Sequence, residues 1–191
     1  MTRELVWTGF VTLDGVGDSP GATTEGHPGG GWVFHTPYVE ESFELKGTEL
    51  AETSALMLGR RSYRDFAAVW PESEDHVDYR DLPKYVVSTT LTDDELVPGW
   101  GQIEILRSTD DVARLKQTDG GAIFIHGSLE LARRLGQAGL IDRYNLLIFP
   151  AVLGSGKRPF PESTAAGQGL TLVESQSYEN GVIKAVYRVE R

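Results

Sequence analysis

Apolar residues recur along the chain in short runs whose spacing predicts strands and helices in alternation. Runs rich in Val, Ile, Phe and Tyr predict strands, because β-branched and aromatic side chains are favoured there. These strands are expected at residues 5–13, 55–58, 84–88, 103–106, 122–126, 144–153, 170–178 and 182–189. Apolar positions three or four residues apart predict helices, which are expected at residues 36–53, 61–69, 110–117 and 129–138.

Residues typical of helix starts and of turns indicate the ends of several elements. Thr36-Pro37 is a typical helix start, and Ser108 or Thr109 is expected to cap a later helix. Asn180-Gly181, between the last two strands, is a strong hairpin signal. Strands that alternate with helices favour a mostly parallel sheet, here closed by an antiparallel hairpin. No linker interrupts the pattern, so residues 1–191 are expected to form one α/β domain.

Composition narrows the classes of function. The chain has 18 basic and 28 acidic residues and a formal charge of -10, which argues against a general nucleic-acid binder. It has no cysteine, no apolar run of about 20 residues and no signal-peptide pattern at its start, so we expect a cytoplasmic protein without a membrane partner. The four histidines lack the spacing of metal ligands, so no metal site is expected.

Three small polar turns follow three of the expected strands. They are Gly59-Arg60-Arg61-Ser62, Ser88-Thr89-Thr90 and His126-Gly127-Ser128. In an open α/β sheet, ligands bind outside the carboxyl ends of the strands, and arginines and helix N-termini there favour anions. The turns therefore predict a site for a phosphorylated ligand. The alternatives are a surface arginine pair, an ordinary polar turn and a serine that only caps a helix.

Two glycine-containing segments have different interpretations. Residues 14–31 form a long glycine-rich loop, and loops of that length are commonly functional. We expect the part from Val16 to Gly31 to close over the ligand and exclude water. Gly154-Ser155-Gly156-Lys157 is not a phosphate loop, because Ala151 and Arg158 stand where that motif needs Gly and Ser or Thr.

The order of these motifs resembles a known family. The chain is similar to the dihydrofolate reductase-like family built on the C-terminal reductase domain of the bifunctional riboflavin biosynthesis deaminase-reductase. Six blocks carry the resemblance: 12–15, 56–63, 84–91, 125–129, 139–144 and 150–156. It implies a dihydrofolate reductase-like three-layer α/β/α fold with a mixed, mostly parallel sheet, NADPH as cofactor, a homodimer and reduction of 5-amino-6-(5-phosphoribosylamino)uracil or a similar heterocycle, imine or carbonyl.

The resemblance also implies where the cofactor binds. The nicotinamide is expected between Thr12 and the Gly127 turn, and the 2′-phosphate near Ser88. The complete expected set is Thr12, Gly59, Arg60, Arg61, Ser62, Ser88, Thr89, Thr90, Gly127, Ser128 and Leu129. The chain departs from the family in two ways. It has no Cys-containing deaminase domain, and His126 precedes Gly127 where dihydrofolate reductases have Gly-Gly.

The substrate half of the site is less defined. Asp14 and Glu44 are the candidate catalytic acids, since the anion left by hydride addition must gain a proton. Asp14 could instead orient the loop, Glu44 could belong to a solvated acidic face, and water could be the donor. Trp32, Phe43 and Trp70 are candidates for a substrate slot, with core packing as the alternative. Two other functions stay open: dihydrofolate reductase proper, and a non-catalytic nucleotide-binding protein.

Overall fold

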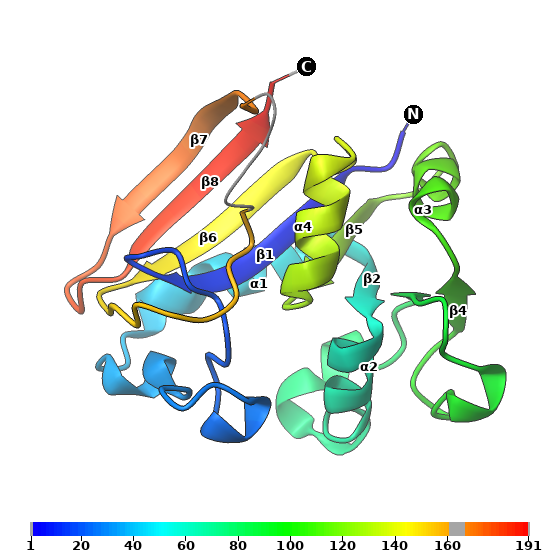
Figure 1. Cartoon of the computed structure of the whole chain (residues 1–191), viewed down its shortest axis with the longest axis horizontal. Helices are drawn as coiled ribbons and strands as arrows, with labels where there is room; N and C mark the ends of the chain where they lie inside the picture. The colour runs from blue at the N-terminus through cyan, green and yellow to red at the C-terminus, as the bar shows by residue number, and fades with distance from the viewer. Residues whose placement is uncertain (1, 161–166, 191) are drawn as a thin grey trace.

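The computed structural model describes residues 2–160 and 167–190. Within them, the strands form one sheet in the order β4-β3-β2-β5-β1-β6-β8-β7 (Figure 1). Neighbouring strands are parallel from β4 to β6, and β8 and β7 are antiparallel to their neighbours. The expected mixed sheet with a closing hairpin is confirmed. The strands are β1 (Leu5–Thr12), β2 (Thr53–Gly59), β3 (Lys84–Val87), β4 (Ile103–Leu106), β5 (Ala122–His126), β6 (Arg143–Phe149), β7 (Leu170–Ser177) and β8 (Ile183–Val189).

Helices cover both faces of the sheet, which gives the three expected layers (Figure 1). They are α1 (Glu44–Glu52), α2 (Arg60–Ala67), α3 (Thr109–Lys116) and α4 (Leu129–Gln137). Helices α3 and α4 bury Val112 and Leu135 against one face. On the other face, α1 buries Leu45 and α2 buries Tyr63. Removing this apolar surface from water stabilises the layers by roughly 25 cal/mol per Å².

Strand register builds a polar row at the centre of the sheet. Alternation along β1 sends Trp7 toward the core with α3 and α4, and Thr8 toward α1. Thr8 is in register with His126 on β5 and with Asn145 on β6. Three polar side chains from three neighbouring strands therefore lie at one level of an otherwise apolar surface.

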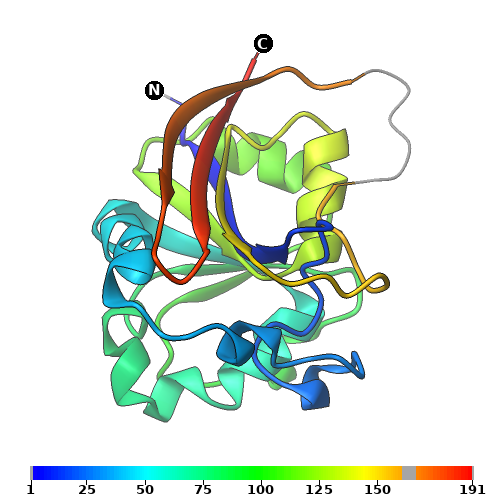
Figure 2. The same cartoon turned by 90° about the vertical axis from the view of Figure 1, so that its left-hand side faces the viewer.

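The C-terminal hairpin forms as expected. β7 and β8 are joined by a turn in which Gly181 has φ +82°, a conformation that favours glycine. β7 is the edge of the sheet (Figure 2), and Leu172 and Val173 on it are exposed. An exposed apolar edge strand suits pairing with another chain. The expected homodimer stays a prediction.

Two element boundaries were predicted wrongly. The helix expected from Thr36 begins only at Glu44, after a 3₁₀ turn at Glu40–Phe43. Thr36 instead ends an earlier 3₁₀ turn, and Val39 is extended, with φ -134° and ψ 118°. β-Branched residues favour that conformation. The strand expected to reach residue 153 ends at Phe149, because the Pro150 that follows has no N–H for the ladder.

The acidic connection after α2 is more ordered than expected. It forms 3₁₀ turns at Trp70–Glu72 and Glu74–Tyr79. The fully buried Lys84 on β3 holds it, since its Nζ donates to the carbonyls of Tyr79, Arg80 and Leu82 at 2.8, 2.9 and 2.8 Å. In the ranges that the structure describes, no helix has the length and apolar composition to cross a membrane.

Candidate functional site

A cleft of about 1270 Å³ opens at the carboxyl ends of the parallel strands. All three turns predicted from the sequence line it: Gly59–Ser62 after β2, Ser88–Thr90 after β3 and Gly127–Leu129 after β5. A fourth turn, Arg107–Thr109 after β4, also lines it and was not expected. The signal for it was present, because Arg107 follows an apolar run and precedes a capping serine.

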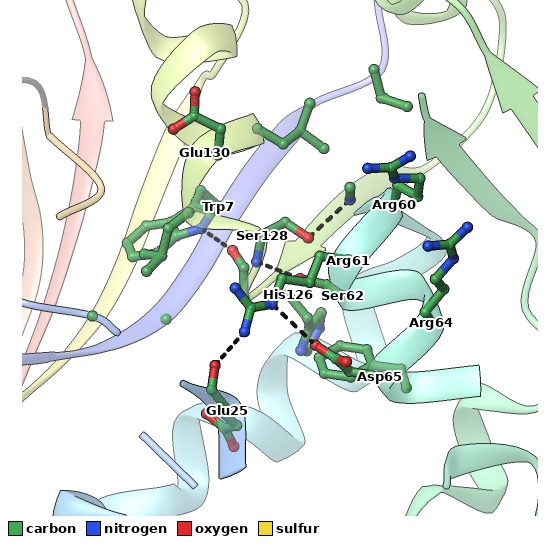
Figure 3. Close-up of a pocket in the computed structure, with 18 of the residues that line it drawn as sticks. Trp7, Glu25, Arg60, Arg61, Ser62, Arg64, Asp65, His126, Ser128 and Glu130 are labelled. Carbon is green, nitrogen blue, oxygen red and sulfur yellow. Dashed lines mark hydrogen bonds and ion pairs between the residues drawn. The ribbon is translucent and has the colours of Figure 1, made fainter. Parts of the chain in front are cut away.

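Two serines connect the turns after β2 and β5. The Ser128 hydroxyl accepts a hydrogen bond from the Gly59 N–H at 3.0 Å, and the Ser62 hydroxyl accepts one from the Ser128 N–H at 3.1 Å (Figure 3). These two N–H groups are therefore already satisfied. Neither hydroxyl donates to any described residue, so both O–H groups are free to donate into the cleft. The interpretation of Ser128 as a helix cap is wrong, since its side chain makes no cap hydrogen bond.

The N-termini of α2 and α4 meet beside these serines. α2 begins at Arg60 and α4 at Leu129, and the first N–H groups of a helix have no partner within it. Aligned peptide dipoles add about half a positive charge at each end. Two helix starts and two hydroxyl donors thus converge on one part of the cleft, an arrangement suited to a diphosphate.

Arginines bring positive charge to the cleft of an acidic protein, beside carboxylates that also line it. The two arginines that begin α2 leave it in different directions (Figure 3). The Arg60 guanidinium donates to Thr90 Oγ1, in the turn after β3, whereas that of Arg61 donates to the Glu25 carbonyl in the glycine-rich loop. The arginines that line the cleft are Arg60, Arg61, Arg64, Arg107 and Arg134.

A buried polar group lies behind the part of the cleft that Thr8 and Lys46 line, and the sequence did not predict it. Glu49 on α1 is 1% exposed and accepts hydrogen bonds from Thr8 Oγ1 at 2.6 Å and Asn145 Nδ2 at 2.8 Å. Lys46 Nζ lies 3.0 Å from its other oxygen and also donates to Thr8. Burial raises the pKa of Glu49, but the Lys46 charge and the two hydrogen bonds outweigh it and hold the pKa below its usual value. Glu49 is therefore ionised at neutral pH.

Aromatic rings surround His126 beside this group. Burial, together with the nearby Lys46 charge, lowers the pKa of His126 to about 4, so the imidazole is neutral at pH 7. Its Nε2 is buried and has no hydrogen-bond partner among the described residues. Trp70 and Tyr79 present their rings to it at centroid distances of 6.1 and 5.4 Å. An unpartnered buried nitrogen on a cleft wall is a candidate for contact with a ligand.

Trp70 lines the cleft as expected, but its ring faces are already covered. Phe66 stacks on one at 4.3 Å with an interplanar angle of 7°, and His76 stacks at 4.3 Å and 20°. Trp70 therefore cannot offer an open face to a flat substrate. Trp32 and Phe43 do not line this cleft: Trp32 is 1% exposed within the core, and Phe43 lines a separate apolar cavity of about 630 Å³.

The two predicted acids and Thr12 also lie outside the cleft lining. Asp14 accepts hydrogen bonds from Thr12 Oγ1 at 2.6 Å and from the backbone N–H groups of Leu153 and Gly154 at 3.2 and 2.8 Å. The hydrogen bond from Thr12 lowers the pKa of Asp14 the most, and the two backbone bonds lower it further. The Asp14 side chain thereby ties two loops together. Glu44 is exposed on α1. The geometry favours the alternatives, a loop-orienting Asp14 and a solvated Glu44.

Comparisons with known proteins agree with this architecture. The chain is 28% identical over 193 residues to YyaP, an uncharacterized protein of Bacillus subtilis (strain 168), with 97% of this chain and 94% of that one covered. A structure from Shewanella sp. PV-4, named for riboflavin biosynthesis, superposes with a TM-score of 0.73 at 20% identity over 100% of both chains. Dihydrofolate reductase from Enterococcus faecalis, complexed with NADP(H), gives 0.60 at 14% identity over 100% of both.

The family comparison covers nearly the whole chain. Residues 3–184 match the family described as the RibD C-terminal domain. That span runs from two residues before β1 into β8, so it includes every turn that lines the cleft. The chain therefore belongs to the RibD C-terminal domain family.

Proposed function

We propose that this chain is an NADPH-dependent reductase of a small heterocyclic, imine or carbonyl compound. One observation carries the proposal: two helix N-termini, two free serine hydroxyls and an arginine-rich wall converge at the carboxyl edge of the sheet. This donor set fits a dinucleotide with an extra phosphate. The Enterococcus faecalis enzyme of the same fold was solved with NADP(H), which supports the choice of cofactor.

The residues divide the cleft into two parts. Ser62, Ser128 and the first turns of α2 and α4 would hold the diphosphate. Arg60 and Thr90 would hold the 2′-phosphate, since an arginine guanidinium binds phosphate strongly. Given the sheet order, the nicotinamide would extend toward β1, near Thr8 and His126. When bound, NADPH supplies a hydride, and the protein positions the reactants and excludes water.

The buried half of the cleft would receive the acceptor. Its walls combine apolar rings with the unpartnered His126 nitrogen and the Lys46 ammonium group. Membership of the family makes 5-amino-6-(5-phosphoribosylamino)uracil the first acceptor to try. Since Trp70 is covered on both faces, binding depends on the ring edges and the polar atoms more than on stacking.

Thermal unfolding with each cofactor tests the proposal. A ligand present at about 100 times its Kd stabilises the folded chain by about 2.7 kcal/mol. We expect NADPH to raise the Tm at lower concentrations than NADH, because NADH lacks the phosphate that Arg60 and Thr90 would bind. Unchanged Tm values with millimolar NADPH and millimolar NADH would refute the proposed cofactor and the function with it.

A further inference from the structure

Lys46 places an ammonium group at the cleft, and one of its three N–H groups has no acceptor among the described residues. Its side chain is 24% exposed and lines the cleft beside Thr8. One N–H bonds to Thr8 Oγ1, and a second lies 3.0 Å from Glu49 Oε2. No described residue accepts the third. The Phe10 ring, whose centroid is 5.2 Å from Nζ, forms an apolar floor beneath it.

The other titratable groups around Lys46 are poor proton donors at neutral pH. Glu49 is ionised and His126 is neutral at pH 7, so neither carries an acidic proton there. Burial and the Glu49 charge raise the pKa of Tyr79 to about 12, which makes its phenol a reluctant donor. His76 is stacked on Trp70, and its Nδ1 lies 2.9 Å from Ser73 Oγ. Burial also lowers the pKa of His76.

Glu49 has hydrogen-bond partners besides Lys46. The carboxylate keeps two hydrogen bonds, from Thr8 and Asn145, that do not depend on the charge of Lys46. Charge-assisted hydrogen bonds of this kind are about twice as strong as neutral ones. The buried carboxylate is therefore not left without partners when Lys46 becomes a neutral amine, and it continues to orient that amine.

We propose that Lys46 is the catalytic proton donor of the reduction and that Glu49 and Thr8 position it. The proposal rests on the proposed function. Hydride addition to the carbon of a C=N or C=O bond breaks the π bond and leaves its electron pair on nitrogen or oxygen. That atom takes a proton from Lys46 Nζ and forms an N–H or O–H bond. The neutral amine then regains a proton from water through the open side of the cleft.

The test compares variants of the whole chain. Wild type is first screened for NADPH oxidation at 340 nm with 5-amino-6-(5-phosphoribosylamino)uracil, dihydrofolate, and a set of quinones, aldehydes and cyclic imines. With the best acceptor, Lys46→Met should lower kcat at least about 100-fold, the lower end of the usual contribution of a general acid. The Kd for NADPH, measured by fluorescence without acceptor, should stay within about twofold. Added methylammonium should restore part of the lost rate.

Two further variants separate the roles of Lys46. Lys46→Arg keeps a positive charge but cannot release its proton, so it should be as slow as Lys46→Met. Lys46→Met combined with Glu49→Gln avoids a buried negative charge without a neighbouring cation, and it should fold and remain slow. The control is Lys184→Met, since Lys184 is also buried and paired with an acid, Glu174, but lies on β8 away from the cleft. It should retain wild-type kcat.

Each outcome has one meaning. Unchanged kcat in Lys46→Met, or full activity in Lys46→Arg, would overturn proton donation by Lys46 while leaving the reductase proposal intact. Loss of NADPH binding in a folded Lys46→Met variant would also overturn it, because Lys46 would then hold the cofactor. Absence of both NADPH binding and acceptor reduction in wild type would overturn the proposed function itself.

Discussion

Replacing Arg60 with alanine should weaken NADPH binding and leave NADH binding nearly unchanged. The Arg60 guanidinium reaches Thr90 across the cleft, where only the 2′-phosphate would need a cation. A hydrogen bond to a charged group contributes about 1.5–3 kcal/mol. Arg60 is exposed, so salt screens it and the lower part of that range applies. About 1.5–2 kcal/mol corresponds to a rise in the Kd for NADPH of roughly 10- to 30-fold.

Fluorescence titration of wild type and Arg60→Ala with each cofactor measures this difference. The titration is repeated at low and at high salt. The loss of NADPH affinity in Arg60→Ala should be smaller at high salt, because the contact is electrostatic and exposed. Arg133→Ala is the matched control: Arg133 is paired with Glu130 at 2.8 Å and does not line the cleft. Equal losses for NADPH and NADH would place Arg60 on the shared diphosphate, and no loss for either would refute its role.

Two predictions concern buried groups. His126 has a pKa of about 4 in the folded chain and about 6.5 in the unfolded chain, so between these pH values only the unfolded chain binds the proton. The free energy of unfolding should therefore fall by about 3 kcal/mol as the pH is lowered from 6.5 to 4. His126→Gln should lose that part of the pH dependence in urea unfolding, and an unchanged slope would contradict it. Lys84→Met should lower the free energy of unfolding by about 2–4 kcal/mol, because it leaves three carbonyls without their donor. Urea unfolding measures this loss, and a loss below 1 kcal/mol would count against the role of Lys84.

The part of the site that the sequence predicted is the part made by contiguous residues. Gly59–Ser62, Ser88–Thr90 and Gly127–Leu129 each stand directly after a strand, and parallel strands end at one edge of the sheet. A turn of this kind can therefore be placed in the cleft once its strand is recognised. The same logic fails inside an element, where the facing of a side chain depends on where that element begins.

The predicted acid shows this failure in physical terms. Glu44 was chosen for a helix expected to start at residue 36, but α1 starts at Glu44 itself. Five residues turn an α-helix by about 500°, so Glu49 lies about 140° around the axis from Glu44. One carboxylate is exposed and the other is buried on Thr8. Two of the three aromatic candidates, Trp32 and Phe43, also lie outside the cleft. An aromatic residue outside the regular helices and strands gives no local sign of whether core or ligand covers it.

The two halves of the cleft therefore differ in the structural features that bring their residues together. The half that would hold the dinucleotide depends on helix starts and turn residues, which directly follow their strands. The half that would receive the acceptor depends on register, because Thr8, His126 and Asn145 lie at one level only when β5, β1 and β6 pair as they do. We therefore expect substitutions at Thr8 or His126, the two residues of the polar row that line the cleft, to change the acceptor without disturbing the turns that would hold the cofactor. Such a division is consistent with a chain that shares its fold with a dihydrofolate reductase at 14% identity. The residues that would face the acceptor have to be identified from the structure of this chain.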